Sequence, residues 1–276
     1  MPGVTRKEGT PPPANASRRR GRWGVALSGR TPGVSKPESG SGSFGGPWRV
    51  AITGLAIFIV SQIIAGVIAE ILLSVVGADT SLDNSNAAQF IYILLAEAMA
   101  VGLVFLALKD RGLKLDSIGL GRRPLWRDLR RAALGFVIFY AALIIAGIII
   151  NLVAPSITNE QQDIGFNTLQ TFSDSVLAFI ALVILPPLGE ETLVRGYLYS
   201  GLRSKMRYLP ALLITSLLFG AAHLSENDSG LLWSGAVDTF LLSVVLVYLR
   251  ENTGALYAGM LVHMANNIIA FGVHFH

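Results

Sequence analysis

Long apolar runs recur along the chain from Val50 onward, and polar or charged residues separate them. The runs predict helices at 50–77, 88–108, 132–153, 175–203, 209–223, 231–249 and 255–272. Most of them reach the ~20 residues that an α-helix needs to cross about 30 Å of hydrocarbon. The fifth is shorter and could extend beyond His223. The pattern therefore predicts an all-α fold, a polytopic membrane bundle of about seven transmembrane helices.

Residues 1–49 have a different composition from the rest of the chain. They are rich in Gly, Ser, Pro and Arg and contain few large aliphatic residues. Such a segment cannot bury a core, so we predict a disordered basic tail at 1–49 and a transmembrane domain at 50–276, with its motif-bearing core at 175–272. The apolar run after Arg49 is far longer than the hydrophobic core of a cleavable signal peptide.

Lysine and arginine are distributed unevenly between the loops. They gather in the tail, in the loops at 109–131 and 203–207, and at Arg250, whereas the loops at 78–86, 154–174 and 224–230 contain none. Cytoplasmic loops carry the excess of positive charge, so we expect a cytoplasmic N-terminus, an external C-terminus and a location in the plasma membrane.

Composition supports a membrane protein and excludes some chemistry. Of the 276 residues, 52% are hydrophobic and 14% charged, well below the roughly 25% charged residues of soluble domains. A net charge of +4 would suggest nucleic acid in a soluble protein, but here the loop distribution explains it, so we expect the lipid bilayer and no nucleic acid as partner. The absence of cysteine rules out disulfides, thiolate metal sites and a cysteine nucleophile.

Three short motifs place polar residues inside the predicted spans: LGEETLVRG (Glu190, Glu191, Arg195), SLLFGAAHL (Phe219, His223) and LVHMANN (His263, Asn267). Residues four apart share one helix face, so Glu191 and Arg195 can neutralise each other. Glu190 then faces a different direction, about 100° around the helix. Counted along their helices, Glu190 lies ~20 Å from Arg203 and His223 ~24 Å from Arg207, so the motifs reach a similar depth.

A carboxylate, two imidazoles and a carboxamide suffice for hydrolysis of an acyl bond by water. Glu190 is the candidate general base, one histidine could orient the water, and the other histidine with Asn267 could donate hydrogen bonds to an oxyanion. Glu190, His223 and His263 could instead bind a zinc ion, although the chain contains no HExxH sequence. An alternative role for His223 or Asn267 is to hold helices together. For the other acids in spans, Glu70, Glu97 and Asp238, we expect packing or interface roles.

The three motifs in this order, EExxxR, FxxxH and HxxxN, resemble the CPBP family, which comprises type II CAAX prenyl proteases and bacteriocin-processing or immunity (Abi) proteins. The resemblance covers about residue 175 to the C-terminus. It implies an intramembrane endopeptidase, of glutamate type or metal-dependent, that cuts a membrane-associated protein or peptide. It assigns Glu190 and His223 to water activation and His263 and Asn267 to the oxyanion, with Glu191, Arg195 and Phe219 as supporting residues.

Two other functions fit the sequence. A membrane immunity or scaffold protein could keep the fold without catalysis. A proton-coupled transporter could use Glu97, Asp238 and the histidines as a relay, but such transporters often contain internal repeats, and we find none. The sequence does not identify the substrate, and no cofactor is required for a glutamate-type mechanism.

Overall fold

The computed structural model describes residues 42–76, 85–154, 166, 169–227 and 230–275. Its helices are α1 (Pro47–Val76), α2 (Asn86–Asp110), the 3-10 turn η2 (Leu115–Ile118), α3 (Trp126–Val153), α4 (Phe172–Phe179), the π-helix η4 (Ile180–Ile184), α5 (Leu185–Glu190), the π-helix η5 (Glu191–Tyr199), α6 (Ser200–Arg203), α7 (Tyr208–Ala221), α8 (Trp233–Thr253) and α9 (Tyr257–Phe275). The strands β1 (Ser225–Asn227) and β2 (Gly230–Leu232) pair antiparallel between α7 and α8. The predicted all-α class is confirmed, and this short hairpin is an addition to it.

Six helices within the described residues are long and apolar enough to cross a membrane: Pro47–Val75, Asn86–Asp110, Trp126–Val153, Phe172–Arg203, Trp233–Thr253 and Tyr257–Phe275. The chain is therefore a multi-pass membrane protein. Their surfaces fit lipid, because large aliphatic side chains such as Ile63, Val137 and Leu152 are more than half exposed.

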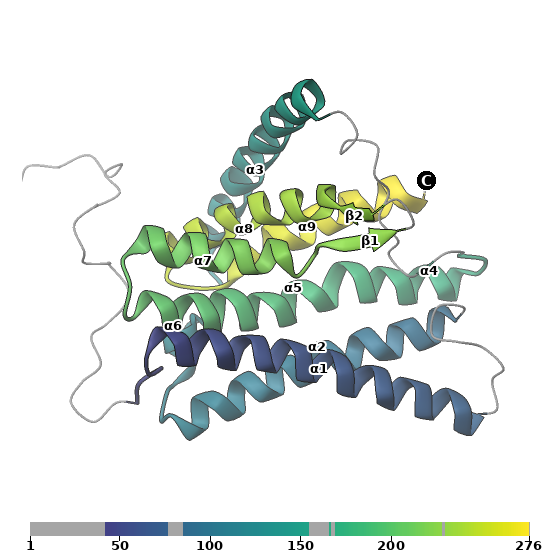
Figure 1. Ribbon diagram of the computed structural model, residues 1–276, viewed down its shortest axis with the longest axis horizontal. Coiled ribbons are helices and arrows are strands. Elements are labelled where there is room, and N and C mark those ends of the chain that lie inside the picture. The colour runs from purple at the N-terminus through teal and green to yellow at the C-terminus, as the bar shows by residue number, and fades with distance from the viewer. Residues whose placement is uncertain (1–41, 77–84, 155–165, 167–168, 228–229, 276) are drawn as a thin grey trace, which may run out of the picture. The chain divides into compact units, whose positions relative to one another are not determined.

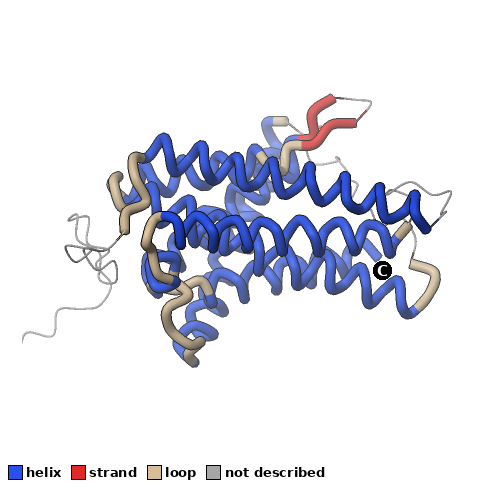
Figure 2. The backbone as a smooth tube through the Cα atoms, turned by 90° about the horizontal axis from the view of Figure 1, so that it is seen from below, coloured by secondary structure: helices blue, strands red, loops and turns tan. Residues whose placement is uncertain are grey.

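The fifth predicted span corresponds to the short helix α7. Helix α7 has 14 residues, or ~21 Å, which is shorter than the hydrocarbon layer. It ends at Ala221, so it does not extend beyond His223 as the apolar run had suggested. Glycine, alanine and then a polar run follow Phe219, and the chain turns into the β1–β2 hairpin (Figure 2).

The segments α4, η4, α5, η5 and α6 form one long helix, which contacts α1, α2, α7 and α9 (Figure 1). Helix α1 packs on α2, α7 on α8, and α3 on α8 and α9. One buried core surrounds Tyr197, Leu198 and Phe219, and a second lies between α3, α8 and α9 around Phe139 and Leu246. The long helix is therefore held from several directions.

The first described residues also contact the long helix. Phe44 is buried, and its ring lies edge-on to Tyr197 with 5.8 Å between the ring centroids. The Arg111 guanidinium donates a hydrogen bond to the Phe44 carbonyl. Most of the predicted disordered tail, residues 1–41, lies outside the described residues.

Polar contacts fix the end of the long helix against α8. Glu251 of α8 forms an ion pair with Arg203 at 3.1 Å and accepts a hydrogen bond from the Tyr199 hydroxyl. Arg250, which is buried, donates to the Ser200 hydroxyl at 3.0 Å. These contacts set the register of the helices on which the motif residues stand.

Candidate functional site

The long helix changes from α to π geometry on both sides of Leu185–Glu190. Two consecutive prolines, Pro186 and Pro187, lie within this α-helical segment. Neither has an N–H, so the Leu182 carbonyl finds no donor in α geometry, where residue 186 would bond it, or in π geometry, where residue 187 would. The π-helices η4 and η5 lie on either side of this proline-containing segment.

Asn267 fills the gap that the prolines create. Its Nδ2 donates a hydrogen bond of 2.9 Å to the Leu182 carbonyl oxygen and so ties α9 to the long helix. Leu182 precedes Glu190 by about two turns, and Asn267 is not among the residues that line the pocket beside Glu190. Asn267 thus contacts the long helix on the N-terminal side of Glu190.

Glu191 and Arg195 form the ion pair that their spacing predicts. Arg195 Nη1 donates to Glu191 Oε1 at 2.9 Å, and both side chains are buried. The Arg195 guanidinium also lies 4.2 Å from the centroid of the Phe219 ring, which gives the cation a second favourable contact. A buried pair of this kind lets both charges exist inside the helix bundle.

His263 lies between the two adjacent glutamates. Its Nδ1 is 3.2 Å from Glu191 Oε1, and its Nε2 is 3.9 Å from Glu190 Oε2. A carboxylate can only accept, so Nδ1–H is the donor toward Glu191. Gly259, one turn earlier on α9, leaves room for Glu191, whose Oε2 lies 3.1 Å from the position of a Cβ there. The sequence paired Glu191 with Arg195 alone, and this second contact with His263 is new.

His223 lies just beyond the end of α7, where the last carbonyls of the helix have no N–H donor within the helix. Its Nδ1 donates to the Phe219 carbonyl at 2.9 Å, because a carbonyl cannot donate. The Phe219 ring lies 4.6 Å from the His223 ring and 6.2 Å from the His263 ring, measured between centroids. Phe219 thus packs against both histidines as well as Arg195.

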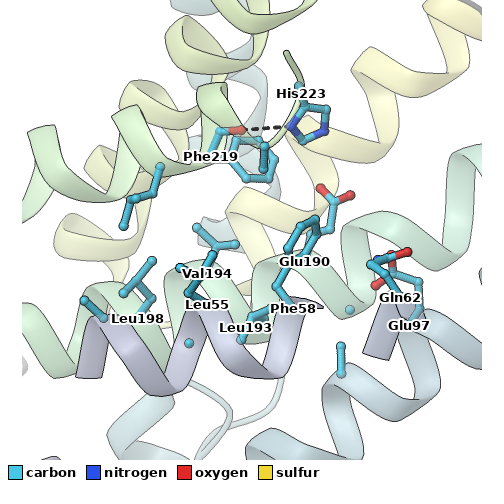
Figure 3. Close-up of a pocket in the computed structure, with 16 residues that line it drawn as sticks. Leu55, Phe58, Gln62, Glu97, Glu190, Leu193, Val194, Leu198, Phe219 and His223 are labelled. Carbon is cyan, nitrogen blue, oxygen red and sulfur yellow. Dashed lines mark hydrogen bonds between the residues drawn. The ribbon is translucent and has the colours of Figure 1, made fainter. Parts of the chain in front are cut away.

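Glu190 and His223 line one pocket between α1, α2, α5, η5 and α7, with a volume of about 80 Å³. Figure 3 shows the Glu190 carboxyl group pointing toward the His223 ring. Most of the wall is apolar, and its polar side chains are Gln62, Glu97, Glu190 and His223. Glu190 Oε2 is buried and has no hydrogen-bond partner among the described residues. A carboxylate with a free oxygen beside an apolar cavity suits a general base.

The proposed zinc ligands do not converge in this structure. Among the described residues, no three His, Asp or Glu side chains lie close enough together to bind one metal ion. Glu190 approaches His223 across the pocket and His263 at 3.9 Å, but the three do not form a ligand set. No step of the chemistry below is derived through a metal.

Glu97, for which a packing or interface role was expected, lies in the pocket. It lies on α2, far from the motifs in sequence, and lines the same cavity as Glu190. The signal that could have found it is an ionisable side chain in the middle of an apolar span, which is by itself a reason to suspect function.

Comparisons with known proteins agree with the motifs. Residues 172–269 match the family model described as type II CAAX prenyl endopeptidase Rce1-like. An uncharacterized 24.3 kDa protein of Escherichia coli is 29% identical to this chain over 143 residues, which are 51% of this chain and 64% of that protein. The match therefore spans less than two thirds of this relative's length. No solved structure shows a significant match to the chain.

All seven motif residues, from Glu190 to Asn267, lie within the matched region. The resemblance that the motifs suggested is therefore confirmed: residues 172–269, the motif-bearing part of the chain, match the Rce1-like family of type II CAAX prenyl endopeptidases.

Proposed function

We propose that the chain is an intramembrane endopeptidase that hydrolyses a peptide bond of a membrane-associated protein or peptide. The observation that carries the proposal is Glu190, whose free carboxylate oxygen lies at an apolar pocket with His223 across from it and His263 beside it. The family match supports a protease in general. CAAX-type or bacteriocin-related processing is the proposed reaction class.

The proposed reaction begins with Glu190 acting on a water molecule. Glu190 takes one proton from the water while the water oxygen bonds to the carbonyl carbon of the substrate, which makes a tetrahedral oxyanion. Glu190 then returns that proton to the leaving nitrogen as the carbon–nitrogen bond breaks. The products are a carboxylic acid and an amine, so atoms and protons balance without a cofactor.

The two histidines are proposed to assist through their Nε2 atoms. Each ring has its Nδ1 held by a fixed acceptor, the Phe219 carbonyl for His223 and Glu191 for His263. Nε2 is therefore the atom that exchanges hydrogen bonds with the water and, when protonated, with the oxyanion. Asn267 is proposed to hold α9 in place through one N–H of its amide, which donates to the Leu182 carbonyl, while its second amide N–H serves as a donor for the oxyanion.

The proposed location is the plasma membrane with a cytoplasmic N-terminus. Arg111, Arg203 and Arg250 mark one end of the bundle. The basic residues gathered at that end support this orientation.

The proposal is tested by comparing membrane peptidomes of cells that lack the protein and are complemented with wild type, Glu190→Gln or Glu70→Gln. Glu70 is the matched control, an exposed acid on α1 away from the pocket. Peptides released by wild type and by Glu70→Gln should be missing with Glu190→Gln. A wild-type peptidome from a Glu190→Gln protein that is present at normal levels would reject the proposal.

Because the structure offers no converged metal site, we also expect the purified protein to cleave such a peptide after treatment with a chelator. The rate should stay within about twofold of the untreated rate, far from the factors of 10²–10⁴ that a lost catalytic group costs. Loss of cleavage on chelation, restored by added zinc, would show that the three candidate ligands converge in the working enzyme.

A further inference from the structure

Glu97 carries a carboxyl group into the pocket from outside the three motifs. It approaches the backbone so closely that a Cβ on Gly189 would overlap its Oε2 and lie 2.9 Å from its Cδ. Gly189, the residue just before Glu190, therefore has to lack a side chain for Glu97 to reach this place. Figure 3 shows Glu97 and Gln62 on one side of Glu190, and all three line the pocket.

Nothing in the described part of the chain neutralises Glu97. No cation lies within ion-pair distance of its carboxyl group, and no side chain or backbone group of the described residues hydrogen-bonds to it. An acid at the centre of a span costs roughly 2.5–3.5 kcal/mol on insertion scales, so its presence calls for a function. The neutral form, which can donate one hydrogen bond and accept others, is the form that avoids repulsion with Glu190.

The pocket contains several polar side chains that could bind one water molecule together. Gln62 accepts a hydrogen bond of 2.6 Å from the Tyr92 hydroxyl through Oε1. This contact directs the amide nitrogen of Gln62 away from Tyr92, as a free donor. A bound water usually needs two to four polar partners, and Gln62, Glu97, Glu190 and His223 supply them within one otherwise apolar cavity.

We propose that Glu97 is a further catalytic residue of the site, which together with Glu190 binds the water molecule that attacks the peptide bond. The inference rests on the proposed function. Glu190 removes one proton of this water, and the neutral Glu97 carboxyl group holds the oxygen in line by a hydrogen bond. Glu97 gains and loses no proton in the reaction.

The test uses the full-length protein in liposomes and the peptide whose release depends on Glu190. Glu97→Met keeps a similar volume and removes hydrogen bonding, Glu97→Gln keeps hydrogen bonding, and Glu70→Met is the matched control for an acid in a span. Glu97→Met should lower kcat by about 10²-fold or more with KM little changed. Glu97→Gln should stay within about tenfold of wild type, because the carboxamide can still bond the water.

Thermal unfolding in detergent separates catalysis from folding. Since Glu97 has no partner to lose among the described residues, Glu97→Met should unfold at the wild-type temperature or above it while its kcat falls. If Glu97→Met is poorly folded, Glu97→Leu serves as the second variant without hydrogen bonding.

The two proposals fail in different ways. A folded Glu97→Met with wild-type kcat, or a folded Glu97→Gln as inactive as Glu97→Met, would overturn the role of Glu97 while Glu190→Gln remains inactive. Full activity of Glu190→Gln would instead overturn the proposed function.

Discussion

Two neighbouring glutamates do different work because the helix turns between them. Glu191 faces inward, where Arg195 and His263 take up its charge, whereas Glu190 faces the pocket with one oxygen unpaired. His263 lies between the two glutamates, since its Nδ1 faces Glu191 and its Nε2 faces Glu190. Glu191 therefore affects the site through His263 as well as through stability.

This division of roles predicts different effects on stability and activity. Glu191→Gln leaves the Arg195 charge buried without a partner, so the free energy of unfolding should fall by about 3–5 kcal/mol. Adding Arg195→Met removes that unpaired charge, and the double variant should recover much of the stability, measured by thermal unfolding in detergent.

The cleavage rate of the double variant should not recover with its stability. His263 has lost its charged partner in both variants, so the double variant should cleave as slowly as Glu191→Gln. Recovery of cleavage together with stability would mean that Glu191 serves only to neutralise Arg195.

At the scale of elements, the two prolines and Asn267 together join α9 to the long helix. The prolines leave the Leu182 carbonyl without a helical donor, and Asn267 supplies one from α9. The motif asparagine thereby fixes α9, which also carries His263, against the helix of Glu190.

Replacing Asn267 should therefore cost stability that a proline substitution returns. Asn267→Leu leaves the Leu182 carbonyl unpaired, which should lower the free energy of unfolding by about 1–3 kcal/mol. Pro186→Ala restores an N–H at the position that bonds residue 182 in an α-helix. In denaturant unfolding, the double variant should be more stable than Asn267→Leu, and equal effects of Pro186→Ala in both backgrounds would contradict the coupling.

The sequence predicted the elements better than their details. Apolar runs located every long helix, and the spacing of Glu191 and Arg195 predicted their ion pair. The run predicted at 209–223 corresponds to the short helix α7, whose end at Ala221 lies two residues before the predicted one.

The side chains that meet in the pocket were harder to predict. Glu97 reaches the pocket of Glu190 by lying on the bare backbone of Gly189, an approach between helices distant in sequence that no periodicity reports. The Asn267 contact with Leu182 depends on which carbonyl the prolines set free, and helix spacing does not report that contact.

For the whole molecule, the ion pairs at one end and the hairpin at the other define two sides. The ion pair between Arg203 and Glu251 joins the C-terminal ends of α6 and α8. The β1–β2 hairpin connects the C-terminal end of α7 to the N-terminal end of α8. The positive loops predict that the first side is cytoplasmic. Labelling tests whether the hairpin side reaches external water.

The chain has no cysteine, so single cysteines can report on each side. With a membrane-impermeant maleimide on intact cells, Lys205→Cys and Lys114→Cys should be labelled only after permeabilisation. Thr171→Cys and Trp233→Cys, at exposed positions, should be labelled without it. The reverse pattern would invert the orientation, and protection of Trp233→Cys alone would mean that the hairpin end of α8 lies inside the membrane.

The central claim is that Glu190 activates the water that cleaves the peptide bond. The direct measurement is the cleavage rate of purified Glu190→Gln in liposomes, beside Glu70→Gln and wild type, with folding verified by thermal unfolding. The account predicts wild-type rates for Glu70→Gln and a loss of about 10²–10⁴-fold for Glu190→Gln. A folded Glu190→Gln that cleaves at the wild-type rate would contradict it.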